Sequence, residues 1–150
     1  MAPQLEAQGA ALYVIGVGTP ESGAEFAELC GFPADKLFVD PTRSVYKSLQ
    51  LYGDLDGTEG WFFDPKVVEG VRRLFFTKVT GERLKERGTE GLKEATRRFK
   101  PLPPPEPRDA VQQGGTFVLR GSEVVMAHRD EATADHAKAE DVLGAAGCGC

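Results

Sequence analysis

The three cysteines are the residues of this sequence best suited to redox or metal chemistry. Cys148 and Cys150 form a Cys-x-Cys pair at the C-terminal end. Such a pair suits a redox-active or metal-binding tail, an acylation site or a mixed disulfide with a partner. An unselective frayed end is the alternative that we favour. Cys30 follows Glu28 at the C-terminal end of an expected helix, so we expect a buried, small apolar residue there and no reactive thiol.

A second group of chemically capable side chains follows an expected strand, in the stretch HRDEATADH. Its members are two histidines and two carboxylates: His128, Asp130, Asp135 and His136. This set is suited to metal binding or proton transfer. We favour a structural role instead, with Asp135 as an N-cap of the last helix and Arg129 paired with an acid. The sequence therefore assigns no catalytic, cofactor-binding or metal-binding residue.

The first third of the sequence predicts alternating strands and helices, the pattern of an α/β fold with parallel pairing. The expected elements are a fully buried strand over Leu12–Val17, a helix from Thr19 to about Cys30, a strand over Leu37–Val39 and a short helix from Thr42. Thr19 and Gly31 are the expected helix caps. Phe26, Leu29 and Cys30 share the face expected to point inward.

The middle of the sequence predicts an insertion rich in helix. Residues 51–61 suit a loop, and residues 65–100 suit helices, the first an amphipathic one over Pro65–Phe76 and a second around residues 92–99. Residues 101–113 begin with PLPPPEP and predict a proline-rich linker. Neighbouring aromatic residues suit core packing better than contact with a partner or a membrane. These aromatic residues are Trp61, Phe62, Phe63, Phe75 and Phe76.

The last part of the sequence predicts a β-hairpin and a helix. Two apolar arms over Thr116–Ala127 flank Gly121-Ser122, a two-residue turn signal with glycine first. A final helix is expected over Ala137–Ala146, followed by a flexible tail at residues 147–150. Nothing divides the chain into two cores, so we expect a single domain over residues 1–150.

Composition excludes several classes of protein. Hydrophobic residues make up 41% and charged residues 27% of the chain, so it is neither disordered nor a membrane protein. The net charge of −5 disfavours a general nucleic-acid binder, and we expect no DNA partner. Residues 66–100 nevertheless carry 11 basic and 5 acidic side chains. They suit a solvated helical face or a docking surface for an acidic protein, an anionic lipid surface or RNA. No apolar run is long enough to span a bilayer, and residues 1–11 lack the features of a transit or signal peptide.

Three stretches occur in a recognisable order: GAALYVIGVGTPE, GFPADKLFVDPTRSVYKSL and QQGGTFVLRGSEVVMAHRDE. Together they resemble the peroxiredoxin-like 2 proteins of the AhpC/TSA group in the thioredoxin superfamily, and most closely their chloroplast branch in plants and algae. The resemblance covers residues 6–143. It implies a thioredoxin-like fold, thiol-dependent antioxidant oxidoreductase chemistry with a thiol electron donor, and a location in the chloroplast, with the cytoplasm as the alternative.

The same resemblance implies that the sheet is incomplete. In that family, a strand and a helix with a Cys-x-x-Cys or single-Cys site come before the strand that LYVIG resembles. Residues 3–8 resemble the last turn of that helix, and Cys30, Cys148 and Cys150 do not match the redox position. We therefore expect redox cysteines outside this chain and no activity of the chain alone. Gly114-Gly115-Thr116 stands where thioredoxins carry a cis-proline; on the residues alone, its glycines suit unusual dihedral angles.

Loss of a central strand would leave two strand edges without backbone partners. Three outcomes follow: the chain is a piece of a longer product, another subunit donates the strand, or the remaining strands close onto each other. We favour them in that order. The alternative function is a non-catalytic thioredoxin-like subunit that docks into a larger chloroplast complex through its basic segment and exposed edges.

Overall fold

The computed structural model describes residues 1–53, 65–75, 82, 85, 107–132 and 135–147. Its longer helices are α1 (Ala2–Ala7), α2 (Pro20–Cys30), α3 (Ser44–Ser48), α4 (Pro65–Phe75) and α6 (Ala139–Gly147). Two short 3-10 helices are η1 (Ala34–Lys36) and η2 (Pro107–Val111). The strands are β1 (Val14–Gly16), β2 (Leu37–Val39), β3 (Gly115–Arg120) and β4 (Glu123–Arg129). The expected helix around residues 92–99 lies outside the described residues.

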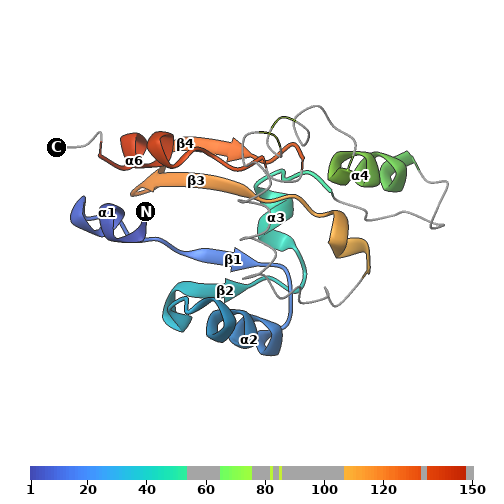
Figure 1. Ribbon diagram of the computed structural model, residues 1–150, viewed down its shortest axis with the longest axis horizontal. Helices are drawn as coiled ribbons and strands as arrows, with labels where there is room; N and C mark the ends of the chain where they lie inside the picture. The colour runs from blue at the N-terminus through green and yellow to red at the C-terminus, as the bar shows by residue number, and fades with distance from the viewer. Residues whose placement is uncertain (54–64, 76–81, 83–84, 86–106, 133–134, 148–150) are drawn as a thin grey trace.

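The described strands form two separate sheets of two strands each (Figure 1). β1 and β2 are parallel, with Val14 opposite Leu37 and Gly16 opposite Val39. β3 and β4 form an antiparallel hairpin. No ladder joins β1 to β3 in the part of the chain that the structure describes, although Figure 1 shows them facing each other. The expected parallel pair and hairpin are confirmed, and the strand sets do not close onto each other.

The ends of α2 follow from local chemistry. Thr19 and Ser22 form a capping box, in which each side chain accepts from the backbone N–H of the other residue. Pro20 takes the first helical position, where a missing N–H has no cost. Gly31 ends the helix in the left-handed region, with φ of 62°. Both expected caps are confirmed.

The face that α2 buries differs from the expected one. Gly23 and Ala27 are buried, and a Cβ atom on Gly23 would lie 2.6 Å from Cγ1 of Val39 in β2. The missing side chain therefore lets the helix approach the strand closely. Leu29 is 46% exposed and Cys30 is also exposed, so the expectation that these two residues point inward was wrong.

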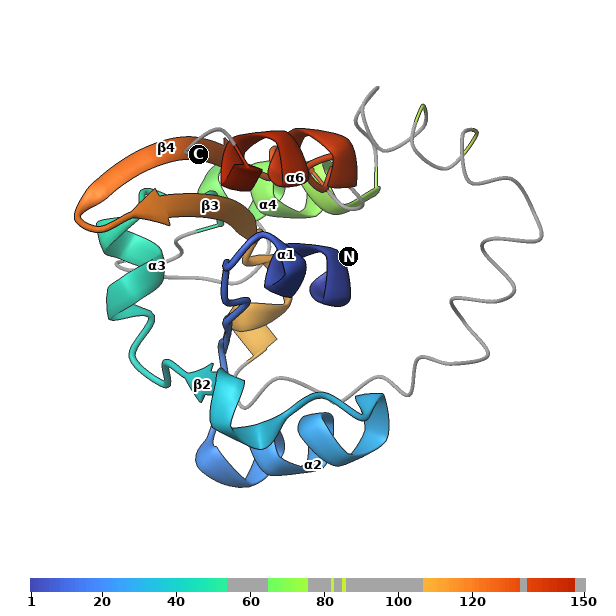
Figure 2. The same ribbon diagram turned by 90° about the vertical axis from the view of Figure 1, so that its left-hand side faces the viewer.

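The first sheet is also less covered than expected. Ile15 in β1 is 41% exposed and Phe38 in β2 is 52% exposed, so the prediction of a fully buried strand was wrong. α2 covers one side of the pair, whereas the other elements lie toward the hairpin (Figure 2). A continuous apolar run gave the strand its propensity, but the described residues supply no layer to bury it.

The hairpin is held by a tight turn and by α6. Gly121 adopts φ of 61° in the two-residue turn, as the sequence predicted. α6 packs on β3 and β4 with Val142 buried, and α1 lies against α6 with Leu5 buried (Figure 2). Within the expected proline-rich linker, residues 107–111 form η2. Val111 of η2 is buried, and α4 approaches it at Gly70.

Candidate functional site

Cys30 is the cysteine that the structure describes, and it is free and exposed. It occupies the last position of α2, where a helix presents carbonyl groups. Reactive cysteines are typically found at helix N-termini, beside N–H groups or cations. Cys148 and Cys150 lie outside the described residues. The geometry therefore places no thiol in a setting typical of a redox centre within the described part of the chain.

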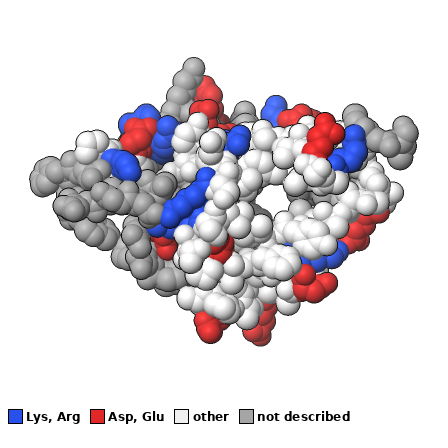
Figure 3. Space-filling model, turned by 180° about the vertical axis from the view of Figure 1, so that it is seen from behind, with Lys and Arg blue, Asp and Glu red and all other residues white. Residues whose placement is uncertain are grey.

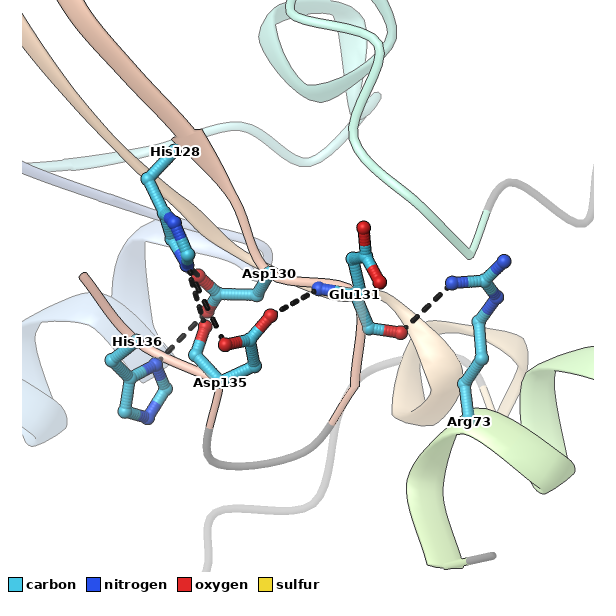
Figure 4. A network of polar contacts seen from close by, with 6 residues as sticks. All are labelled: Arg73, His128, Asp130, Glu131, Asp135 and His136. Atoms are coloured by element: carbon cyan, nitrogen blue, oxygen red, sulfur yellow. Dashed lines mark hydrogen bonds and ion pairs between the residues drawn. The ribbon is translucent and has the colours of Figure 1, made fainter. Parts of the chain in front are cut away.

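The four side chains of the HRDEATADH stretch do come together, at the end of β4 and in the segment before α6 (Figure 4). We call them the His–Asp cluster: His128, Asp130, Asp135 and His136. Nδ1 of His136 lies 2.9 Å from Oδ2 of Asp130. Nε2 of His128 lies 3.0 Å from the carbonyl oxygen of Asp135 and 3.5 Å from Oδ1 of Asp130. A carbonyl oxygen only accepts, so Nε2 of His128 carries a proton.

The two carboxylates of the cluster are buried, with Asp130 5% and Asp135 7% exposed. Asp135 accepts the N–H of Glu131 at Oδ2, 3.0 Å away, which closes the segment on itself. α6 begins only at Ala139, so the expected role of Asp135 as cap of that helix was wrong. The cluster instead fixes the path of the chain as it leaves β4.

The cluster also has contacts to other elements. The backbone N–H of Asp130 donates to the carbonyl of Gly114, 3.0 Å away, at the entry to β3. Arg73 of α4 donates to the carbonyl of Glu131 at 2.9 Å, and its guanidinium lies over the ring of Tyr52 (Figure 4). Among the described residues, no three His, Cys, Asp or Glu side chains are arranged to hold a metal ion.

The sequence had suggested an acidic partner for Arg129, but among the described residues Arg129 forms no ion pair. Its Nε donates to the carbonyl of Leu49 at 2.7 Å, and its guanidinium lies 5.5 Å from the ring centre of Phe117. Leu49 is the C-terminal cap of α3, whose last carbonyls lack partners within the helix. The bond therefore joins the hairpin to the end of a helix in the first half of the chain.

The two glycines where β3 begins, Gly114 and Gly115, serve close approach and not unusual dihedral angles. Neither Gly114 nor Gly115 has a positive φ, so the expected conformational role was wrong. A Cβ atom on Gly115 would lie 2.7 Å from the carbonyl oxygen of His128 and 2.9 Å from Cδ2 of Leu51. Gly115 therefore leaves the space in which Leu51 and β4 pack.

Two buried charged groups were missed by the sequence reasoning. Asp40, at the end of β2, accepts hydrogen bonds from the N–H groups of Ser44 and Val45 and so begins α3. Arg43 has φ of 58°, and its Nε lies 3.4 Å from Oδ1 of Asp109, with both side chains buried. The spacing of Asp40 and Ser44 is a local cap signal that was open to detection. The partner of Arg43 lies far along the sequence and was not.

The contact between His136 and Asp130 predicts a small loss of stability when His136 is replaced. Replacing His136 by alanine (His136→Ala) is expected to lower the free energy of unfolding by about 1 kcal/mol, because Asp130 loses a donor while the imidazole is largely open to solvent. Urea unfolding at neutral pH measures the change. Lys138→Ala alters an exposed neighbour and is the control. Equal stability of the two variants would contradict a structural role for His136.

The fold described above is a mixed α/β fold of the thioredoxin-like class, with an incomplete sheet. The family model of the AhpC/TSA antioxidant enzymes matches residues 1–132, and the chain belongs to this family. No curated protein and no solved structure matches the chain. In the described residues, no helix is both long enough and apolar enough to cross a membrane.

Proposed function

We propose that this chain is part of a thiol-dependent antioxidant protein of the peroxiredoxin-like 2 type, whose redox cysteines lie on polypeptide outside residues 1–150. The observation that carries the proposal is the split between the sheets. Within the described residues, β1 and β3 face each other without a ladder, and Cys30 stands at a helix end that suits no redox thiol. Membership of the AhpC/TSA family supplies the thiol chemistry.

The proposal includes a partner and a location. A thiol electron donor would reduce the oxidised cysteine after each turnover, since peroxide reduction oxidises a thiol. We propose the chloroplast as the location, from the sequence resemblance, with the cytoplasm as the alternative. No DNA is involved in this function.

A peroxide assay tests where the thiols are. The chain, with dithiothreitol as reductant, is expected to consume hydrogen peroxide at the rate of the reductant alone, because the proposal places the redox cysteines elsewhere and Cys30 lies at a helix C-terminus, which does not activate a thiol. Cys30→Ser and the double variant Cys148→Ser, Cys150→Ser are the matched controls. Activity above the background that one of these variants abolishes would place the redox centre in this chain and overturn the proposal.

The transcript upstream of the Met1 codon gives an independent test. An in-frame segment that encodes a strand, a Cys-x-x-Cys or single-Cys site and a helix would support the enzyme. Peroxide reduction by that longer product, lost on substitution of the upstream cysteine, would establish it.

A non-catalytic subunit of a larger chloroplast complex is the second candidate. The observation that favours it is the surface of α4, where Val68 is 54% and Val71 40% exposed beside Arg72, whose half-exposed guanidinium pairs with Glu69. An apolar stripe beside cations suits a protein partner, and a membrane surface is the alternative. An in-frame stop codon directly upstream of Met1, together with an inactive chain, would favour this candidate.

A further inference from the structure

The backbone groups of β1 point alternately toward β2 and toward the opposite edge of the strand. Gly16 directs its carbonyl toward β2, where it accepts the N–H of Asp40 at 2.8 Å. Backbone polar groups alternate between the two edges of a strand. The polar groups of the two neighbouring residues, Ile15 and Val17, therefore point to the opposite edge, away from β2.

Tyr46 of α3 occupies this edge. Its hydroxyl donates to the carbonyl of Ile15 at 2.7 Å. This bond satisfies the carbonyl that Ile15 presents on the edge away from β2. In a parallel ladder, one residue of the neighbouring strand donates to one carbonyl and accepts from the N–H two residues further on. The hydroxyl of Tyr46 thus makes the bond to the carbonyl of Ile15 that the N–H of a parallel neighbour would make.

The phenol is held in its protonated form. Burial raises the pKa of Tyr46, and the nearby charge of Asp40 raises it further, whereas the backbone of Val17 has a smaller, opposite influence. The hydroxyl is therefore a donor throughout the neutral pH range. Asp40 also begins α3, so the same carboxylate places Tyr46 on the edge.

The space beyond this edge is open. Figure 3, seen from behind, shows an opening through the molecule surrounded by uncharged atoms, where the turned view places the gap between β1 and β3. The arrows of β1 and β3 run in opposite directions in Figure 1. A strand parallel to β1 would therefore be antiparallel to β3, which is the pairing that β3 already makes with β4.

We propose that the hydroxyl of Tyr46 occupies a hydrogen-bonding position on the edge of β1 that a neighbouring strand would otherwise fill. An extended peptide that pairs parallel to β1 displaces this hydroxyl. The occupant is an uncharged β-strand segment, because main-chain groups line the edge and uncharged atoms surround the opening. The inference rests on the proposed function only in that both require a strand from outside residues 1–150.

A synthetic peptide tests the displacement. The probe is a nine-residue peptide of alternating valine and threonine with a lysine at each end and a fluorescent label, and its affinity is measured by anisotropy. Tyr46→Phe is expected to bind about 5–10-fold more tightly than the wild type, because the peptide N–H no longer competes with a hydroxyl for the carbonyl of Ile15. Tyr52→Phe removes a hydroxyl elsewhere and is expected to bind as the wild type does.

Two further measurements make each outcome decisive. The same peptide with every second nitrogen methylated cannot form the ladder and is expected not to bind. Hydrogen exchange on the wild-type chain is expected to show slower exchange at Ile15 and neighbouring amides when the unmethylated peptide is present. Equal affinity for wild type and Tyr46→Phe overturns the proposal, as does binding without change in exchange or no binding at all. The peptide carries no cysteine, so this result is independent of the peroxide assays.

Discussion

Replacing Asp40 by asparagine (Asp40→Asn) is expected to lower the free energy of unfolding at pH 7 by about 2–3 kcal/mol. Oδ2 accepts the N–H of Val45 at 2.7 Å, and Oδ1 accepts the N–H and the hydroxyl of Ser44 and the hydroxyl of Thr42. An amide has one oxygen and one NH2 group. Whichever way it turns, it presents a donor to at least one of these donors, and a buried hydrogen bond is lost.

The effect of Asp40→Asn depends on pH in a defined direction. Burial alone would raise the pKa of Asp40, but the hydrogen bonds from Val45, Ser44 and Thr42 outweigh it and lower the pKa below its ordinary value. A carboxylate with a lowered pKa stabilises the fold above the pKa of the unfolded chain, about 4, and this contribution is lost as the pH falls further. The stability gap between wild type and Asp40→Asn should therefore narrow as the pH falls below about 4.

Urea unfolding at pH 7 and pH 3 measures both effects. Asp35→Asn is the control, because Asp35 is exposed in η1 and its substitution is expected to change stability by less than about 0.5 kcal/mol. A gap of the same size at both pH values would contradict the account of Asp40 as an ionised cap.

Adding one methyl group at Gly115 (Gly115→Ala) is expected to cost about 2–3 kcal/mol of stability. The new Cβ would lie 2.7 Å from the carbonyl oxygen of His128 in β4 and 2.9 Å from Cδ2 of Leu51. The first of these clashes is with backbone, so rotation of a side chain cannot relieve it. Relief of the clash requires β3 to move from β4 or Leu51 to leave its buried position. Thermal unfolding by circular dichroism measures the loss.

Gly144→Ala is the matched control for this substitution. Gly144 lies in α6, and no described residue outside the backbone of that helix has an atom within 4 Å of the added Cβ, so alanine is expected to raise stability by up to about 1 kcal/mol through helix propensity. Opposite signs for the two glycines are the expected result. A neutral Gly115→Ala would show that the entry to β3 has room to adjust.

The features predicted correctly from the sequence are those with local causes. The N-cap at Thr19, the C-cap at Gly31 and the turn at Gly121 each depend on residues within four positions of one another. Alternation of apolar strands and helices likewise indicated the parallel pair. The family resemblance added the split between the two sheets, which no periodicity could indicate.

The wrong predictions concern which element, if any, covers the apolar face of a helix or strand. Periodicity identifies the apolar side of α2 and β1, but not whether another element covers it, so Leu29, Cys30 and Ile15 were wrongly expected to be buried. The partners of Arg129 and Asp135 were wrong for a related reason. The guanidinium of Arg129 donates a hydrogen bond to the carbonyl of Leu49, 80 residues away in the sequence. Only the tertiary structure brings these two groups together.

The bond between Arg129 and Leu49 also bears on how the molecule folds. α3 has five residues, too few to persist as an isolated helix, and its two ends depend on different parts of the chain. Asp40 secures its start from nearby, whereas Arg129 secures its end across a long loop. Closing that loop costs chain entropy before any contact rewards it, so α3 should consolidate late, after the hairpin has docked. The helix thus acts as a cooperative link between the two halves of the chain, because its stability depends on both.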